Sequence, residues 1–155
     1  MKGNEKVIAK LNDLLSDELT TISQYMVHSE MCDNWMYEEL HKKVEERAIT
    51  EMKHAERLIG RILFLDGSPV VSNLKKINIG ADIEKQFAND LAAEFVAVQG
   101  YNDGIRLASE LGDNGSRELM VSILTDEENH VDWLEAQIDQ IKMMGLQAYL
   151  VEHVD

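Results

Sequence analysis

Four long stretches of this sequence carry apolar residues with the period of an α-helix, and each apolar stripe contains a glutamate near its middle. The stretches cover roughly residues 4–33, 37–65, 82–110 and 115–143. Their apolar residues recur every three or four positions and therefore share one face of a helix. Each stretch would be roughly 42 Å long at about 1.5 Å per residue. Helices of this length predict an elongated all-α bundle.

The segments between the helices predict how the bundle is connected. Short polar breaks at residues 33–34 and 112–116 indicate antiparallel neighbours, with Ser116 as the N-cap of the fourth helix. Residues 67–81, by contrast, are long enough to run the length of a bundle. We therefore expect one domain over all 155 residues, a four-helix bundle with one long crossover and a short fifth helix within residues 146–154.

The stripes themselves carry polar residues where a core is usually apolar. They read Ile8, Leu11, Leu15, Glu18, Ile22 and Tyr25 in the first helix; Val44, Ala48, Glu51, His54, Leu58, Ile62 and Leu65 in the second; Phe87, Leu91, Glu94, Val98, Tyr101 and Ile105 in the third; and Leu119, Ile123, Glu127, His130, Leu134, Ile138 and Ile141 in the fourth. In the second and fourth helices, a histidine follows the glutamate three residues later, so both side chains lie on one face.

A buried carboxylate without a partner costs several kcal/mol. Four that face one core would repel one another, and would unfold the bundle or take up protons. Two divalent cations would remove this conflict, and four carboxylates with two imidazoles suit iron or manganese better than a thiolate zinc site. Di-iron carboxylate bundles have this general ligand pattern. The sequence thus predicts a two-metal site made by Glu18, Glu51, His54, Glu94, Glu127 and His130.

The spacing of glutamate and histidine is not specific by itself. Glu38 and His41 have the same spacing near the start of the second helix, with no matching acids on the other helices. We expect this pair to face solvent. The prediction of a metal site rests on the four stripes together.

Charge and composition exclude several classes of protein. Acidic residues outnumber basic ones 29 to 15, for a net charge of −14, which argues against a nucleic-acid partner. The charge either favours solubility or forms a field that attracts cations, and composition leaves both open. No apolar run reaches the length of a membrane span, and the first residues lack an apolar signal core. The single cysteine, Cys32, fits a cytoplasmic location.

Several motifs resemble those of bacterioferritins. They are Glu51-Met-Lys-His54-Ala, Asp126-Glu127-Glu128-Asn-His130-Val-Asp-Trp133-Leu-Glu, the opening Met-Lys-Gly with Leu-Asn-x-Leu-Leu, Arg61-Ile-Leu-Phe-Leu65 and Met144-Gly-Leu-Gln-x-Tyr149-Leu. The resemblance covers essentially the whole chain and is denser around the metal motifs than in residues 66–115. It implies a ferritin-like bundle.

The resemblance also implies a role for each predicted ligand. Glu51 and Glu127 would bridge two irons, Glu18 and Glu94 would be terminal carboxylates, and the histidine after each bridging glutamate would cap one iron. Tyr25, seven residues after Glu18 on the same stripe, would orient a ligand or donate an electron, or serve only as a core residue. Such a centre is a ferroxidase that oxidises Fe(II) with O2 or H2O2.

Members of the family assemble into a hollow homo-oligomeric shell, a 24-mer of roughly two dozen subunits, that stores ferric mineral. The resemblance implies the same assembly here, with a ferredoxin-type reductant as a partner for iron release. Ile49, Met52 and Ile59 form a second apolar strip on the second helix, away from the metal stripe, which supports a subunit interface.

The resemblance further implies a haem b shared by two subunits through Met52. Two thioethers across a two-fold interface are a soft ligand set that suits haem iron, although methionine also packs at interfaces without any ligand. The residues expected to line the haem pocket are Leu19, Ile22, Ser23, Met26, Ile49 and Val71.

The chain departs from the family pattern in residues 45–50. There the pattern often reads aromatic-His-Glu-x-Ile-Asp, whereas this chain reads Glu45-Glu46-Arg47-Ala48-Ile49-Thr50. The missing aromatic residue, with Met26, weakens the expectation of haem. Glu46 and Thr50 replace residues of an inner-surface iron site, so that Glu46 is the remaining candidate ligand and Thr50 could widen or neutralise an iron path.

Three other functions compete with iron storage. A peroxide-scavenging protein related to rubrerythrin would need a Cys-x-x-Cys module, which one cysteine excludes. A helical interaction protein would not explain four glutamates in the stripes. A DNA-binding miniferritin has its metal sites between subunits and fits an acidic chain poorly. Particle size discriminates, because a store forms a much larger particle than the first two alternatives.

Overall fold

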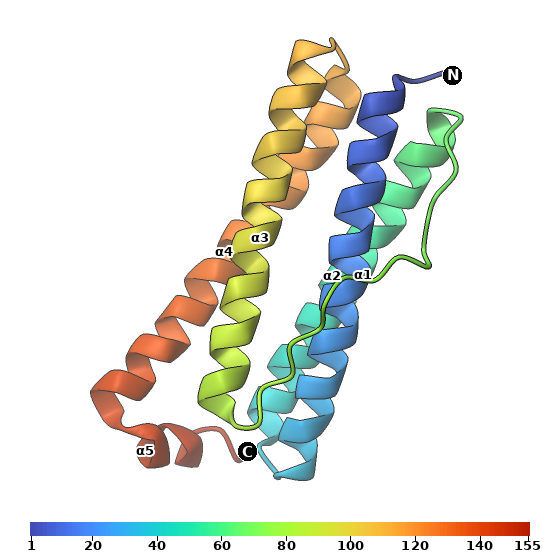
Figure 1. The fold of residues 1–155 in the computed structure, drawn as a ribbon. Helices are drawn as coiled ribbons and strands as arrows, with labels where there is room; N and C mark the ends of the chain where they lie inside the picture. The colour runs from blue at the N-terminus through green and yellow to red at the C-terminus, as the bar shows by residue number, and fades with distance from the viewer.

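Four long helices and one short helix make up the computed structural model, which describes residues 1–155 (Figure 1). The helices are α1 (Glu5–Asn34), α2 (Glu38–Phe64), α3 (Ile83–Glu110), α4 (Asn114–Met144) and α5 (Leu146–Val151). Helices α1 and α2 form one antiparallel pair and α3 and α4 a second, while residues 65–82 run back along α1 to the start of α3. The predicted bundle with one long crossover and a short C-terminal helix is confirmed. None of the helices combines the length and the apolar character needed to cross a membrane.

The N-cap predicted for α4 is wrong by three residues. Asp113 caps the helix, because its carboxylate accepts a hydrogen bond from the backbone N–H of Ser116 at 3.0 Å. Ser116 lies in the first turn, and its hydroxyl donates to the Asp113 carboxylate at 2.7 Å. The Arg61 guanidinium of α2 also donates to Asp113, at 2.8 Å. It donates to the Ser116 hydroxyl as well, at 2.9 Å, so these contacts join the start of α4 to α2.

The core of the bundle consists of two apolar layers with a polar layer between them. One layer lies at the end where α2 ends and α4 begins, and contains Val7, Leu11, Leu14, Leu15, Ala55, Leu58, Ile62, Leu65, Ala97, Tyr101, Ala108, Met120 and Ile123. The other lies at the α5 end and contains Cys32, Leu40, Ile83, Phe87, Leu134, Ile141 and Tyr149. The glutamates of the four stripes lie between these layers, and water has little access to them.

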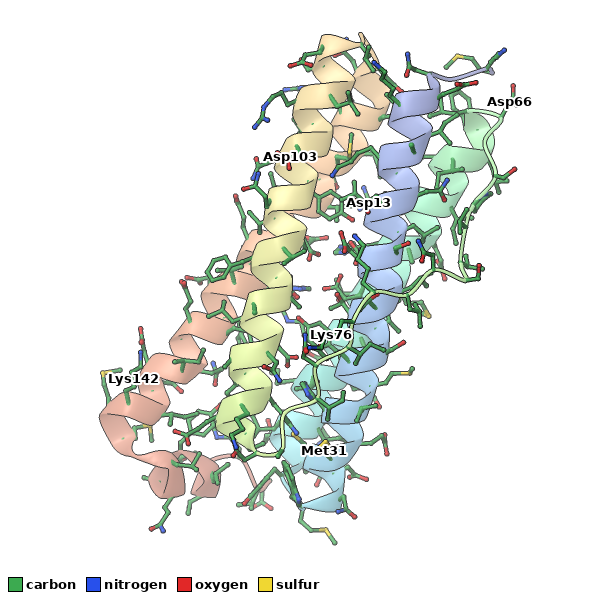
Figure 2. All side chains as sticks on the ribbon, viewed as in Figure 1. Asp13, Met31, Asp66, Lys76, Asp103 and Lys142 are labelled. Atoms are coloured by element: carbon green, nitrogen blue, oxygen red, sulfur yellow. The ribbon has the colours of Figure 1, made fainter.

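Polar side chains of α1 hold the crossover against the bundle. Figure 2 marks its course from Asp66, at the end of α2, past Lys76. The backbone N–H groups of Val70, Lys75, Asn78 and Gly80 donate to the side chains of Asn12, Thr20, Gln24 and His28 at 2.8–3.0 Å. These four α1 residues are four or eight positions apart, so they share one face of the helix. The crossover is therefore ordered along its length although it contains no helix or strand.

His28 is the most buried of these anchors. Its Nε2 accepts the N–H of Gly80 at 3.0 Å, which assigns the ring proton to Nδ1, where it is donated to Asp90 at 2.9 Å. Gln24 also donates to Asp90, at 2.8 Å. Only glycine fits at position 80, since a Cβ there would lie 2.3 Å from the backbone nitrogen of Gln86. This network joins α1, the crossover and α3.

Replacement of His28 by alanine should loosen the crossover. The change leaves a buried N–H without an acceptor, at a cost of about 1–3 kcal/mol. We expect trypsin to cut after Lys75 or Lys76 on the order of tenfold faster, because cleavage follows the population of the open segment. The matched control is His41→Ala, because His41 bonds Ser29 and does not touch the crossover. Equal cleavage of the two variants would contradict the role of His28.

Candidate metal centre

The structure brings the six predicted ligands together at the middle of the bundle. Their exposed fractions are 0–2 %. The side chains form two groups, of which one contains Glu18, Glu51, His54 and Glu127, and the other Glu51, Glu94, Glu127 and His130. Within each group the candidate ligand atoms lie within 4.8 Å of one another. The two groups share two glutamates, so the arrangement suits two metal ions held side by side.

Each histidine reaches across to the glutamate of the other motif. His54 Nδ1 lies 2.9 Å from Glu127 Oε1, and His130 Nδ1 lies 2.8 Å from Glu51 Oε1. Each also lies near the glutamate that belongs to its own group alone, at 3.6 Å for Glu18 and 3.2 Å for Glu94. The two imidazole rings are stacked with centroids 6.4 Å apart. Glu51 and Glu127 therefore lie between the two halves of the centre.

The centre has too few hydrogen-bond donors for its oxygen atoms. Four carboxylates present two oxygens each, whereas the donors directed at them are two phenols and two imidazole nitrogens. Three buried oxygens, Glu51 Oε1, Glu94 Oε2 and Glu127 Oε1, accept no hydrogen bond. Two of them lie within ion-pair distance of a histidine, but the N–H does not point at them. A buried oxygen that accepts no hydrogen bond has lone pairs free, and a cation can bind to them.

Burial and mutual repulsion make the carboxylates hard to ionise. Burial raises the pKa of the Glu51 carboxyl well above its usual range, and the charge of Glu18 adds to the shift. Burial likewise raises the pKa of Glu94, with repulsion from Glu127 added. Burial opposes the charged form of His54, but the nearby Glu127 and Glu18 outweigh it and raise the pKa of this imidazole to about 10. The folded chain therefore holds protons here until a cation replaces them.

Two tyrosines donate to the terminal carboxylates. The hydroxyl of Tyr25 donates to Glu94 Oε1, and that of Tyr101 donates to Glu18 Oε1. Burial raises the pKa of both phenols, and the charges of Glu94 and Glu18 raise them further, so each hydroxyl remains a donor. The prediction of Tyr25 as a group that orients a ligand is consistent with its contact.

The surroundings of the two histidines differ. The Nε2 of His54 lies 2.9 Å from the Asp126 carboxylate, which is 45 % exposed. The corresponding position before Glu51 is Thr50, whose hydroxyl donates to the backbone oxygen of Glu46. On that side the Arg47 guanidinium lies over the Trp133 ring, 5.9 Å from its centroid. One half of the centre therefore faces a carboxylate and the other a cation.

Glu46, the Glu38 and His41 pair, and Cys32 lie outside the two groups of candidate ligands. Glu46 lies on the surface and joins no group of three or more metal-binding side chains. Glu38 pairs with Lys42 at 3.1 Å on the surface, and His41 bonds Ser29, so the repeated glutamate–histidine spacing does not build a second centre in the core. Burial raises the pKa of the Cys32 thiol to about 12, which leaves it unreactive.

Met52 lies in an open groove of about 330 Å³ on the surface of α1 and α2. The lining residues are Ile22, Met26, Ser29, Glu30, Glu45, Ala48, Ile49 and Met52. Met52 is 45 % exposed, so its thioether is free to meet a ligand or a second copy of the chain. Two such grooves face to face would form an apolar pocket with one thioether from each side, which fits the ligand set expected for haem.

Four other residues of the expected apolar surface are not among those that line this groove of the single chain. Ile59 and Leu19 are half-buried and pack against the first apolar layer. The hydroxyl of Ser23 donates to the backbone oxygen of Leu19. Val71 lies on the crossover, where it is exposed.

Comparison with known proteins identifies the family. Residues 8–144 match the family described as ferritin-like domain. A bacterioferritin of Rhodobacter capsulatus is 42 % identical over 149 residues, which cover 96 % of this chain and 92 % of the relative. The chain belongs to the bacterioferritin family. Other relatives include the bacterioferritin of Brucella melitensis, 38 % identical with the same coverage, and bacterioferritin BfrA of Mycobacterium tuberculosis, 38 % identical over 99 % of this chain and 97 % of the relative.

Two residues of this bacterioferritin-family centre were missed by the analysis of the sequence. Asp126 precedes Glu127 directly, and a second acid beside a ligand was a usable signal. Tyr101 follows Glu94 by seven residues, as Tyr25 follows Glu18, so the same spacing could have found it. Both contact a predicted ligand, and such contacts depend on how the helices pack.

The metal-free protein, prepared with a chelator, should lose stability as pH rises. Glu51 and Glu94 have raised pKa values when folded, so above about pH 4.5 the folded state keeps protons that the unfolded state has lost, and stability falls as pH rises from there. His54 acts in the same direction, since its contribution is complete below the unfolded pKa of 6.5 and is lost as pH rises through about 10. Thermal unfolding between pH 5 and 10 measures how the stability of the metal-free protein changes with pH.

Glu94→Gln should stabilise this metal-free protein at pH 8, by about 1–3 kcal/mol, because the wild-type carboxyl must either bury a charge or hold a proton against the pH, whereas the amide is neutral and keeps an acceptor for Tyr25. Added Zn(II) or Mn(II) should stabilise the wild type more than the variant, because the cation binds the folded carboxylates. The control is Glu118→Gln, an exposed position on α4. A destabilised Glu94→Gln protein would contradict the repulsion described here.

Proposed function

We propose that this chain stores iron and oxidises Fe(II) at the centre between its helices. The observation that carries the proposal is a buried set of four glutamates and two histidines with more acceptors than donors. Its bacterioferritin relatives support the storage of iron. A structural role for these acids alone would leave several buried oxygens without compensation.

In the proposed centre, each Fe(II) substrate ion has its own histidine and terminal glutamate. Glu18 and His54 would hold one ion, Glu94 and His130 the other, and the shared pair Glu51 and Glu127 would bridge them. The assignment follows from the two overlapping groups of side chains. A histidine must be neutral to bind a metal ion. Metal binding should therefore release protons from His54 and from the carboxyl groups whose pKa is raised.

The proposed reaction uses the two ions as a pair. Each Fe(II) gives up one electron, and one O2 takes up both electrons and two protons to form H2O2. With H2O2 as the oxidant, the two electrons and two protons yield two water molecules. A pair of adjacent irons thereby avoids one-electron reduction of the oxidant. Tyr25 and Asp126 would hold Glu94 and His54 in position during this transfer.

We further propose that the chain assembles into a closed homo-oligomeric shell, a 24-mer of roughly two dozen copies, in which the oxidised iron is stored. Exposed apolar side chains on α1, α2 and the crossover, such as Met26, Phe64 and Val71, are suited to contacts between copies. A ferredoxin-type reductant would release the iron. The cytoplasmic location stays a prediction.

Rapid mixing of the metal-free protein with Fe(II) in the presence of O2 tests the ferroxidase. We expect a fast oxidation phase that saturates near two irons per chain, and a slower uptake beyond saturation if iron is stored. Glu18→Ala and His130→Ala should lose the fast phase, because each removes a ligand from a different half of the centre.

The matched control is His41→Ala, which removes the histidine of the surface glutamate–histidine pair and should keep the fast phase. A wild-type protein without a saturating phase would refute the ferroxidase. Loss of the phase in His41→Ala as well would show that the assignment of ligands is wrong.

Haem binding through Met52 makes a separate proposal. Reconstitution should load one haem for every two chains, with the absorption spectrum of iron held by two thioethers. Met52→Leu should lose this spectrum, whereas Met26→Leu, in the same groove, should keep it. The same spectrum in wild type and Met52→Leu would contradict the proposal.

A further inference from the structure

The two tyrosines at the centre are related by the same spacing and by crosswise contacts. Tyr25 lies seven residues after Glu18 on α1, and Tyr101 lies seven residues after Glu94 on α3. Seven residues are about two helical turns, so each tyrosine shares a face with the glutamate before it. Neither bonds that glutamate. Tyr25 donates to Glu94 on α3, and Tyr101 donates to Glu18 on α1.

Tyr101 is held rigidly in this position. It is 0 % exposed and belongs to the apolar layer at the end where α4 begins. The hydroxyl of Tyr101 donates its hydrogen bond to the Glu18 carboxylate. A tyrosine whose ring packs in an apolar layer and whose hydroxyl leaves that layer can direct a hydrogen bond with little freedom.

We propose that Tyr101 is a positioning residue for Glu18, so that the centre has two phenol donors, one for each terminal carboxylate. The hydrogen bond restricts rotation of the Glu18 carboxylate, whose oxygens keep further lone pairs for a metal ion. The inference rests on the proposed function, because it assigns Glu18 to the half of the centre that contains His54. It predicts that each half depends on the tyrosine of the opposite helix pair.

The alternative is that Tyr101 only fills the core. The chain supplies a matched comparison in Tyr149, which is also 0 % exposed and donates to the Gln137 side chain at 2.7 Å in the other apolar layer. Tyr149→Phe removes a buried phenol hydroxyl far from the glutamates. An effect that Tyr101→Phe shows and Tyr149→Phe does not is therefore an effect on the centre.

Anaerobic titration with Co(II), followed by its visible absorption, measures metal affinity without the oxidation reaction. The wild type, Tyr101→Phe, Tyr25→Phe and Tyr149→Phe should all bind two Co(II) per chain. Tyr101→Phe and Tyr25→Phe should each lower the affinity for one of the two Co(II) ions by about tenfold, which is the usual effect of removing a hydrogen bond to a metal ligand. Tyr149→Phe should bind both ions as the wild type does.

Double variants test the contact itself. In a Glu18→Ala background, Tyr101→Phe should have no further effect on Co(II) affinity, because its partner is gone. In a Glu94→Ala background, it should keep its effect of about tenfold. Tyr25→Phe should show the reverse pattern. A general loss of packing would not make the effect of each tyrosine depend on one particular glutamate.

The outcomes separate the inference from the proposed function. Two Co(II) ions bound by the wild type, with unchanged affinity in Tyr101→Phe, would overturn the inference and leave the metal centre standing. Equal losses in Tyr101→Phe and Tyr149→Phe would also overturn it, since they would indicate packing alone. A wild type that binds no Co(II) would refute the metal centre and the inference together.

Discussion

The repulsion among four buried carboxylates is the constraint on which the rest of this structure depends. Glu18, Glu51, Glu94 and Glu127 occupy the layer where a helical bundle would otherwise place leucine or valine. Their charges are tolerated only with protons or cations between them. Apolar layers on both sides supply the stability that this layer lacks, so that the bundle can hold an electrostatically unfavourable site in a fixed shape.

The crossover connects the end of α2 to the start of α3 at the opposite end of the bundle. The chain therefore returns along the bundle between these two helices, which run in the same direction (Figure 1). That return leaves a long segment without regular structure, whose backbone donors need partners. Polar side chains of α1 provide them through Thr20, Gln24 and His28. The same helix thus serves the metal layer and the crossover.

The two halves of the centre are similar in their ligands and different in their surroundings. Asp126 beside His54 favours positive charge there, whereas Arg47 over Trp133 brings positive charge to the other side. Thr50, which takes the place of an acid in the family pattern, bonds within its own helix, so the Nε2 of His130 has no carboxylate like the one that Asp126 offers to His54. The two candidate metal positions therefore differ in their electrostatic surroundings, although each consists of three glutamates and one histidine.

The sequence by itself determined the helices, the one long crossover and the six polar residues that face the core, because helical periodicity and the cost of burying charge are local rules. The tertiary structure alone decided which side chains meet across helices. Arg61 of α2 meets both Asp113, the cap of α4, and Ser116 in its first turn. Tyr101 meets Glu18, and His28 accepts the N–H of Gly80, through contacts between residues 83 and 52 positions apart. Such pairs depend on the rotation of each helix about its axis, which packing fixes and periodicity along one helix does not.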